Sequence, residues 1–191
     1  GAFGVMAIAL AGQDAWSAVN IGKDADVAAG PEYTRVFQAA VDAREFASGS
    51  NVQDWNQATN MVITGQAGGQ IMGDWAQGEF QVAGQVAGVD YTCLSGLGEA
   101  EILDTGGDAF YFPVNNDPEI QAVQLELASL LISPAVQVSF NLAKGSLPVR
   151  GDIDMSSAND FMQKGLDILA SGNILPSGDQ SLTPDTQTQV V

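Results

Sequence analysis

The chain has 191 residues, of which 46% are hydrophobic, so it has enough apolar side chains for a folded core and is not a disordered polypeptide. It carries 23 acidic residues, six lysines and arginines and no histidine, for a formal net charge of −17. This charge argues against binding to nucleic acids or membrane surfaces, and the lack of histidine excludes Ser-His-Asp, Cys-His and histidine-zinc sites. We expect no metal and no cofactor.

Four apolar segments are predicted as short strands. Residues 3–10 are uniformly apolar, which is typical of a strand that is buried on both faces, and the run is shorter than the ~18 residues that a membrane span needs. Residues 68–72, 91–94 and 108–114 are the other three, the last being rich in Phe and Tyr and followed by turn residues.

Helix start and stop signals recur between these segments. Pro31 stands at the tolerated first-turn position of a helix, Asp54 stands at an N-cap position, and Gly65 follows as a stop. Four helices are predicted with both ends, at 32–46, 55–64, 135–142 and 159–170. Three more are predicted by their starts alone, near 14, at 74–75 and at 117–119. Because helices alternate with short strands, the predicted fold class is α/β, a short mixed sheet flanked by helices.

Two tryptophans each follow an aspartate directly, at Asp54-Trp55 and Asp74-Trp75. An indole offers a flat apolar face and one N–H donor, and a carboxylate offers acceptors. This combination suits a ligand with apolar C–H faces and many hydroxyl groups. The pattern therefore indicates a sugar.

Several blocks resemble one protein family. Residues 54–80 contain Met72-Gly73-Asp74-Trp75 after a helix, and residues 133–152 contain Lys144-Gly145-Ser146-Leu147-Pro148-Val149-Arg150. Ala11-Gly12-Gln13 with Trp16, Tyr91-Thr92-Cys93 and Gly107-Asp108-Ala109-Phe110 are shorter matches. Together these blocks resemble the extracellular solute-binding proteins of ABC sugar importers, of the glucose/mannose-binding type.

The resemblance implies a type II periplasmic-binding-protein lobe. Residues 1–176 would form the C-terminal α/β lobe of a two-lobed protein, residues 177–191 would form a polar tail, and the N-terminal lobe would be missing from the chain. Truncation or degradation of a longer protein, or omitted residues, would each explain this length. The implied partners are a glucose-like monosaccharide, the missing lobe and the membrane subunits of an ABC permease. The implied location is the periplasm, or the cell exterior with a membrane tether.

Site residues follow from the resemblance. Trp55 and Trp75 would stack on the sugar ring, Asp108 would accept hydrogen bonds from its hydroxyls, and Lys144 would donate to them. Each has an alternative role: a tryptophan at a helix start is often part of the core, Asp108 in a strand could bind a backbone donor, and a lysine among so many acids commonly forms a salt bridge.

Three further polar residues complete the predicted binding set. Asp74 would contact the sugar or, as the favoured alternative, cap the following helix. Gln13 matches a family segment, and Gln180 stands near the position where glucose-binding members have a histidine that contacts the sugar.

Two other positions are predicted to be structural. Cys93 is the one cysteine, and Ala158 stands about where the gram-negative glucose-binding members are expected to have its partner, so we expect a buried, inert thiol. Arg150 is expected to anchor its loop through Asp152 or Asp154.

Three functions are compatible with these residues. The favoured one is a binding subunit without catalytic activity. A glycosidase-like enzyme would use two carboxylates, such as Asp74 and Asp108, as acid and base. A structural module that kept the fold and lost the ligand is the third.

Overall fold

The computed structural model describes residues 2–177, 183 and 185, and the chain divides into two compact units. Unit 1 comprises Gly1–Met72, Cys93–Gly106 and Asp167–Val191, and unit 2 comprises Gly73–Thr92 and Gly107–Leu166. The chain passes between them in both directions, so neither unit is one continuous segment.

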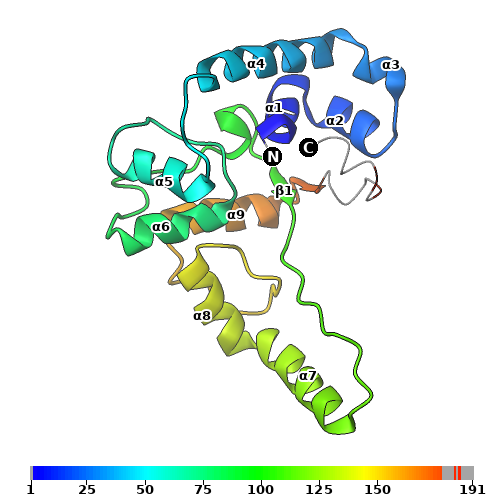
Figure 1. The fold of residues 1–191 in the computed structure, drawn as a ribbon, viewed down its shortest axis with the longest axis vertical. Coiled ribbons are helices and arrows are strands. Elements are labelled where there is room, and N and C mark those ends of the chain that lie inside the picture. The colour runs from blue at the N-terminus through cyan, green and yellow to red at the C-terminus, as the bar shows by residue number, and fades with distance from the viewer. Residues whose placement is uncertain (1, 178–182, 184, 186–191) are drawn as a thin grey trace. The chain divides into compact units, whose positions relative to one another are not determined.

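Unit 1 consists mainly of helices, with one small sheet (Figure 1). Its elements are α1 (Ala2–Ala11), α2 (Gln13–Asn20), α3 (Ala25–Ala28), α4 (Pro31–Ala47), α5 (Trp55–Ile63), the 3-10 helix η2 (Ser95–Gly98), β1 (Leu103–Thr105) and β2 (Ile174–Pro176). Helix α9 (Asp160–Ser171) begins in unit 2 and ends in unit 1.

Helix α1 stands where a strand was predicted, so that prediction is wrong. A uniformly apolar run has no periodicity that separates a buried strand from a buried helix. Alanine, leucine and methionine, which make up much of this segment, are strong helix formers. Met6, Ala7 and Ile8 of this helix are buried, so the segment is a core element as expected.

The core of unit 1 forms around α1. Trp16 of α2, Tyr33 and Val36 of α4, and Leu175 of β2 are buried with it in one hydrophobic cluster. Figure 1 shows α4 running past α1 and α2. The polar end of Tyr33 is hydrogen-bonded, since Asn20 Nδ2 donates to its hydroxyl over 3.3 Å.

The sheet consists of β1 and β2, which pair in parallel with Leu103 opposite Ile174. Within the described residues, the segments 68–72, 91–94 and 108–114 form no strand, and Tyr91 makes only an isolated bridge with Ala87. Those three predictions are wrong because a short apolar segment becomes a strand only where a partner strand lies beside it. The described part of the chain is thus helix-rich with a small parallel sheet rather than a mixed one, which is compatible with a binding-protein lobe.

Unit 2 contains the other helices. They are the 3-10 helix η1 (Asp74–Ala76), α6 (Gln77–Val82), α7 (Pro118–Leu131), α8 (Pro134–Lys144) and the first part of α9. The predicted starts of α7 and α8 are confirmed, since Asp117 and Ser133 are N-caps that precede Pro118 and Pro134. Helix α8 continues two residues beyond its predicted end at 142, and Gly145 ends it in the left-handed conformation. The predicted boundaries of α4, α5 and α9 agree within two residues.

Helices α7 and α8 are joined through a 66° bend. Within the described residues no single helix has the length and apolar composition needed to cross a membrane, and α7 and α8 meet that criterion only as a bent pair. All of α7 is described, and none of its side chains is buried.

Candidate functional site

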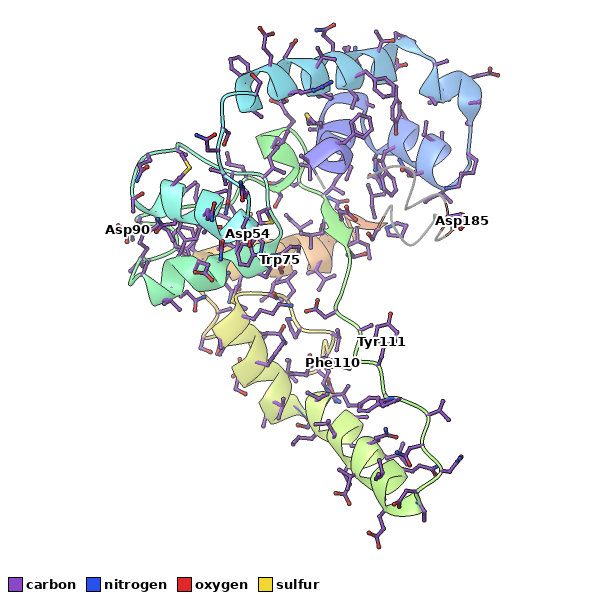
Figure 2. All side chains as sticks on the ribbon, viewed as in Figure 1. Asp54, Trp75, Asp90, Phe110, Tyr111 and Asp185 are labelled. Carbon is purple, nitrogen blue, oxygen red and sulfur yellow. The ribbon has the colours of Figure 1, made fainter. Side chains whose placement is uncertain are left out.

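Trp75 is held at the start of unit 2 by its approach to a glycine. A β-carbon placed on Gly73 would lie 2.0 Å from Cζ3 of the Trp75 ring, so the indole occupies the space that any side chain at position 73 would need. The residue is 46% exposed and is labelled in Figure 2. Trp75 therefore presents a half-exposed apolar surface, which is the arrangement that stacking on a sugar ring requires.

The Asp74 carboxylate accepts hydrogen bonds from a turn that is distant in sequence. The Leu147 amide donates to Oδ2 over 3.3 Å, and the Ser146 hydroxyl lies 3.4 Å from Oδ1. Burial raises the pKa of Asp74, and the Leu147 amide and the nearby Lys144 charge partly offset this rise. Asp74 is the first residue of η1, and its carboxylate joins η1 to the turn at 146–147.

Lys144 ends α8 and forms an ion pair with Asp108. Its side chain is 28% exposed and that of Asp108 is 67% exposed, and its ammonium also lies 5.8 Å from the centre of the Phe140 ring, one helical turn earlier. The salt bridge predicted as an alternative for Lys144 is thus present. Asp108 lies in an extended segment outside any strand, so its predicted position in a strand is wrong.

The residues from Lys144 to Leu147, named here the 144–147 turn, pack closely on helix α6. Gly145 has φ of 80°, which favours glycine, and a β-carbon there would lie 2.7 Å from Gln77 Nε2. Gln77 Nε2 donates to the Gly145 carbonyl over 2.7 Å. The conformation of this turn therefore depends on glycine at position 145.

Four of the seven predicted binding residues, namely Asp74, Trp75, Asp108 and Lys144, thus belong to unit 2. The remaining three are Trp55 and Gln13, which belong to unit 1, and Gln180, which lies outside the described residues. Trp55 is the first residue of α5 and is 37% exposed, and Gln13 is exposed at the start of α2.

The two Asp-Trp pairs differ in what the carboxylate does. Asp54 is the N-cap of α5 and accepts from the Trp55 amide over 2.8 Å, so it acts on its own helix. Asp74 instead bonds to residues more than 70 positions away, although the amide of Trp75 also lowers its pKa. The favoured prediction that Asp74 caps the following helix is therefore wrong, because Gly73 and Ala76 are the N-caps of η1 and α6 and neither helix has a side-chain cap hydrogen bond.

The structural prediction for Arg150 is confirmed, since Nε donates to Asp152 Oδ1 over 2.7 Å and Nη2 donates to Oδ2. Its Nη1 also donates to the carbonyl of Ile132 at the end of α7, over 3.2 Å. Cys93 is half-buried rather than buried, with Sγ 3.8 Å from the Ser95 hydroxyl.

Sequence reasoning missed two residues that shape this region, Gln77 and Phe140. A glutamine is usually exposed, so nothing in the sequence marked Gln77 as buried. Phe140 could have been found from its spacing, because it precedes Lys144 by four residues on one helix and the two share a face.

No family model matches the chain. The chain is 35% identical over 164 residues, 85% of its length, to a "Probable sugar-binding periplasmic protein" of Rhizobium meliloti (strain 1021). A protein of the same description from Brucella suis biovar 1 (strain 1330) is 47% identical over 102 residues, 53% of the chain. An "Uncharacterized ABC transporter extracellular-binding protein" of Pyrococcus horikoshii is 27% identical over 178 residues, 92% of the chain.

The chain matches only a part of these relatives. The aligned regions are 39%, 24% and 39% of the Rhizobium, Brucella and Pyrococcus proteins, respectively. The relatives are described as binding proteins and not as enzymes, which fits the prediction of a protein without catalytic activity, and their descriptions support the predicted periplasmic or extracellular location. The chain is therefore homologous, over part of their length, to periplasmic sugar-binding proteins and an extracellular-binding protein of ABC transporters.

Proposed function

We propose that the chain is the C-terminal lobe of the substrate-binding protein of an ABC sugar importer. The complete protein would bind a glucose-like monosaccharide between two lobes in the periplasm and deliver it to the membrane permease. The observation that carries this proposal is the half-exposed Trp75 next to Asp74, in the same unit as the Lys144–Asp108 ion pair.

The side chains of unit 2 have the chemistry that a sugar needs. The Trp75 indole would pack on the apolar C–H face of the ring, the carboxylate of Asp108 would accept from hydroxyls, and the Lys144 ammonium would donate to them. Such a site binds by stacking and directed hydrogen bonds and needs no reaction step.

The charges favour a neutral sugar. The positive charge of Lys144 is already paired with Asp108, and Asp74 is a second carboxylate whose pKa is influenced by the same lysine. An anionic sugar would have to approach two acids and one compensated base in a chain with a net charge of −17. We therefore propose glucose-like neutral hexoses rather than uronic acids or sugar phosphates.

A single lobe would bind its sugar weakly, because one side of the ligand stays in water. Closure of a second lobe supplies further hydrogen bonds and excludes that water, and losing these contacts costs several kcal/mol, on the order of a hundredfold or more in affinity. A second, N-terminal lobe in the complete protein is thus part of the proposal.

The test is to titrate two proteins with D-glucose, D-galactose, D-mannose and D-xylose and to measure binding by the change in tryptophan fluorescence. One protein is the 191-residue chain and the other is a longer polypeptide that carries it behind an N-terminal lobe. Saturable binding by the longer protein, with weaker or undetectable binding by the chain alone, is the expected result. Binding of none of the four sugars by the longer protein would contradict the proposal.

A further inference from the structure

Gln77 is a buried amide whose hydrogen bonds converge from three segments of unit 2. Gln77 is only 2% exposed. Nε2 donates to the Gly145 carbonyl over 2.7 Å, and Oε1 accepts from the Tyr91 hydroxyl over 3.1 Å and from Asn159 Nδ2 over 2.5 Å. The amide thus uses both its donor and its acceptor in the protein interior, where an unsatisfied group would be costly.

The partners of Gln77 are themselves fixed. The Tyr91 ring stacks on Phe80 of α6 with the ring centres 4.3 Å apart. Asn159 precedes α9 and accepts from the Met162 amide over 3.0 Å. The Oε1 atom of Gln77 is therefore anchored by two residues that have no part in the proposed site.

The other side of the amide holds the 144–147 turn. Gly145 stands between Lys144 and Ser146, and Ser146 and Leu147 contact the Asp74 carboxylate. The approach is close, because a β-carbon on Gly78 would lie 3.4 Å from the Lys144 carbonyl. Gln77 follows Asp74 by three residues and Trp75 by two, so its side chain links the segment of Asp74 and Trp75 to the turn that begins at Lys144.

We propose that Gln77 is a positioning residue, which fixes Lys144 and the 144–147 turn relative to Asp74 and Trp75 without contacting the ligand. This inference rests on the proposed sugar-binding function. Methionine has an apolar side chain of similar length and lacks both polar atoms of the Gln77 amide. The substitution would keep every residue that we expect to contact the ligand but would remove the hydrogen bonds that fix their positions.

The first experiment measures glucose affinity of the longer two-lobed protein with Gln77→Met, with Lys144→Met and with both. We expect Gln77→Met to lower the affinity about tenfold, and to lower it by a much smaller factor once Lys144 is already methionine. If Gln77 only stabilised the fold, Gln77→Met would lower the glucose affinity by the same factor with lysine or methionine at position 144. Unchanged affinity of Gln77→Met, or effects of the two substitutions that multiply, would overturn the inference.

Gln137→Met is the matched control. Gln137 is a half-buried glutamine in the same unit, and its side chain bonds to the Leu131 carbonyl, the Val149 amide and the Asn141 side chain, with no direct bond to the 144–147 turn. The Gln137→Met variant should bind glucose with an affinity within about twofold of the wild-type value. If Gln77→Met does not fold, Tyr91→Phe removes a single bond to Gln77 while keeping the stacked ring, and it should lower the affinity by a smaller factor with the same dependence on Lys144.

A readout that needs no ligand separates this inference from the proposed function. Hydrogen exchange at the Leu147 amide should become at least about tenfold faster in Gln77→Met, while amides in the middle of α9 keep the wild-type rate. If the wild type bound no sugar, the proposed function would fail while this measurement still applied. Unchanged exchange at Leu147 would show that Gln77 does not hold the turn.

Discussion

The Trp75 indole occupies the space beside Gly73 so closely that a β-carbon on Gly73 would lie within 2.0 Å of the ring. This contact fixes one face of the tryptophan and leaves 46% of the residue exposed. A glycine and an aromatic side chain two residues apart therefore define the orientation of the surface on which we expect a sugar to stack.

Substitution Gly73→Ala tests that orientation. The added methyl group has to displace the ring, so we expect glucose affinity of the two-lobed protein to fall about tenfold and the tryptophan emission to shift to longer wavelength. Stability should change by less than about 1 kcal/mol, because the indole is only half-buried. Gly69→Ala is the control, since nothing lies within 4 Å of a β-carbon there. Wild-type affinity in Gly73→Ala would show that the position of Trp75 has no role in binding.

Gly145→Ala should destabilise unit 2. Position 145 has φ of 80°, and a β-carbon would lie 2.7 Å from Gln77 Nε2, so alanine meets both backbone strain and a steric conflict. We expect the free energy of unfolding to fall by about 1–3 kcal/mol, measured by urea denaturation. Gly151→Ala, in the same unit and with no heavy atom within 4 Å, should change it by less than about 0.5 kcal/mol. Equal effects of the two substitutions would contradict this account of the turn.

Asp74 makes stability depend on pH. Burial raises its folded-state pKa, so the folded state holds this proton more tightly than the unfolded state. Its contribution to stability is fully present below the ordinary aspartate pKa of about 3.9 and is lost as pH rises through the folded-state pKa. The unfolding free energy of the wild type, relative to that of Asp74→Asn, should therefore decrease between that pH and neutrality.

Asp152→Asn is the control of opposite sign. The Arg150 guanidinium hydrogen-bonds to Asp152 and lowers its pKa, so this carboxylate contributes stability above the ordinary pKa and loses the contribution as pH falls. Denaturant titrations at several pH values would measure both differences. A wild-type minus Asp74→Asn difference that rises with pH would mean that the carboxylate is held in its charged form by its partners.

Asp108→Asn should change the charge preference of the site. It leaves the Lys144 ammonium without its ion-pair partner, so the affinity for glucuronate relative to glucose should increase about three- to tenfold at low salt and less at high salt. Asp160→Asn removes the partner of Lys164 in the same unit and should leave that ratio unchanged. An unaltered ratio in Asp108→Asn would place Lys144 outside the ligand site.

The sequence predicted most helices because their signals are local. Pro31, Asp54, Gly65 and Asp117 act on their own helix ends, so each boundary can be found within a few residues of its signal. Strands lack such signals. The segment that became α1 is equally apolar on all sides, and β1 pairs with a strand about 70 residues later, so neither could be assigned from its own residues.

The same difference between local and distant contacts applies to the candidate site. The Arg150–Asp152 pair was predicted because the residues are two positions apart. The Lys144–Asp108 pair joins residues 36 positions apart, and a salt bridge could be expected for the lysine without its partner being known. Gln77 escaped prediction since its burial depends on Tyr91, Gly145 and Asn159, which only the fold brings to one place.

The most direct test of the proposed function is a glucose titration of the two-lobed protein and its Trp75→Leu variant, measured by calorimetry. Phe46→Leu, which alters an 89% exposed aromatic residue outside the predicted site, is the control. We predict saturable binding by the wild type and the control, and affinity at least about tenfold weaker in Trp75→Leu. Equal affinity in all three proteins, or no binding of glucose, galactose, mannose or xylose by the wild type, would contradict a sugar site at Trp75.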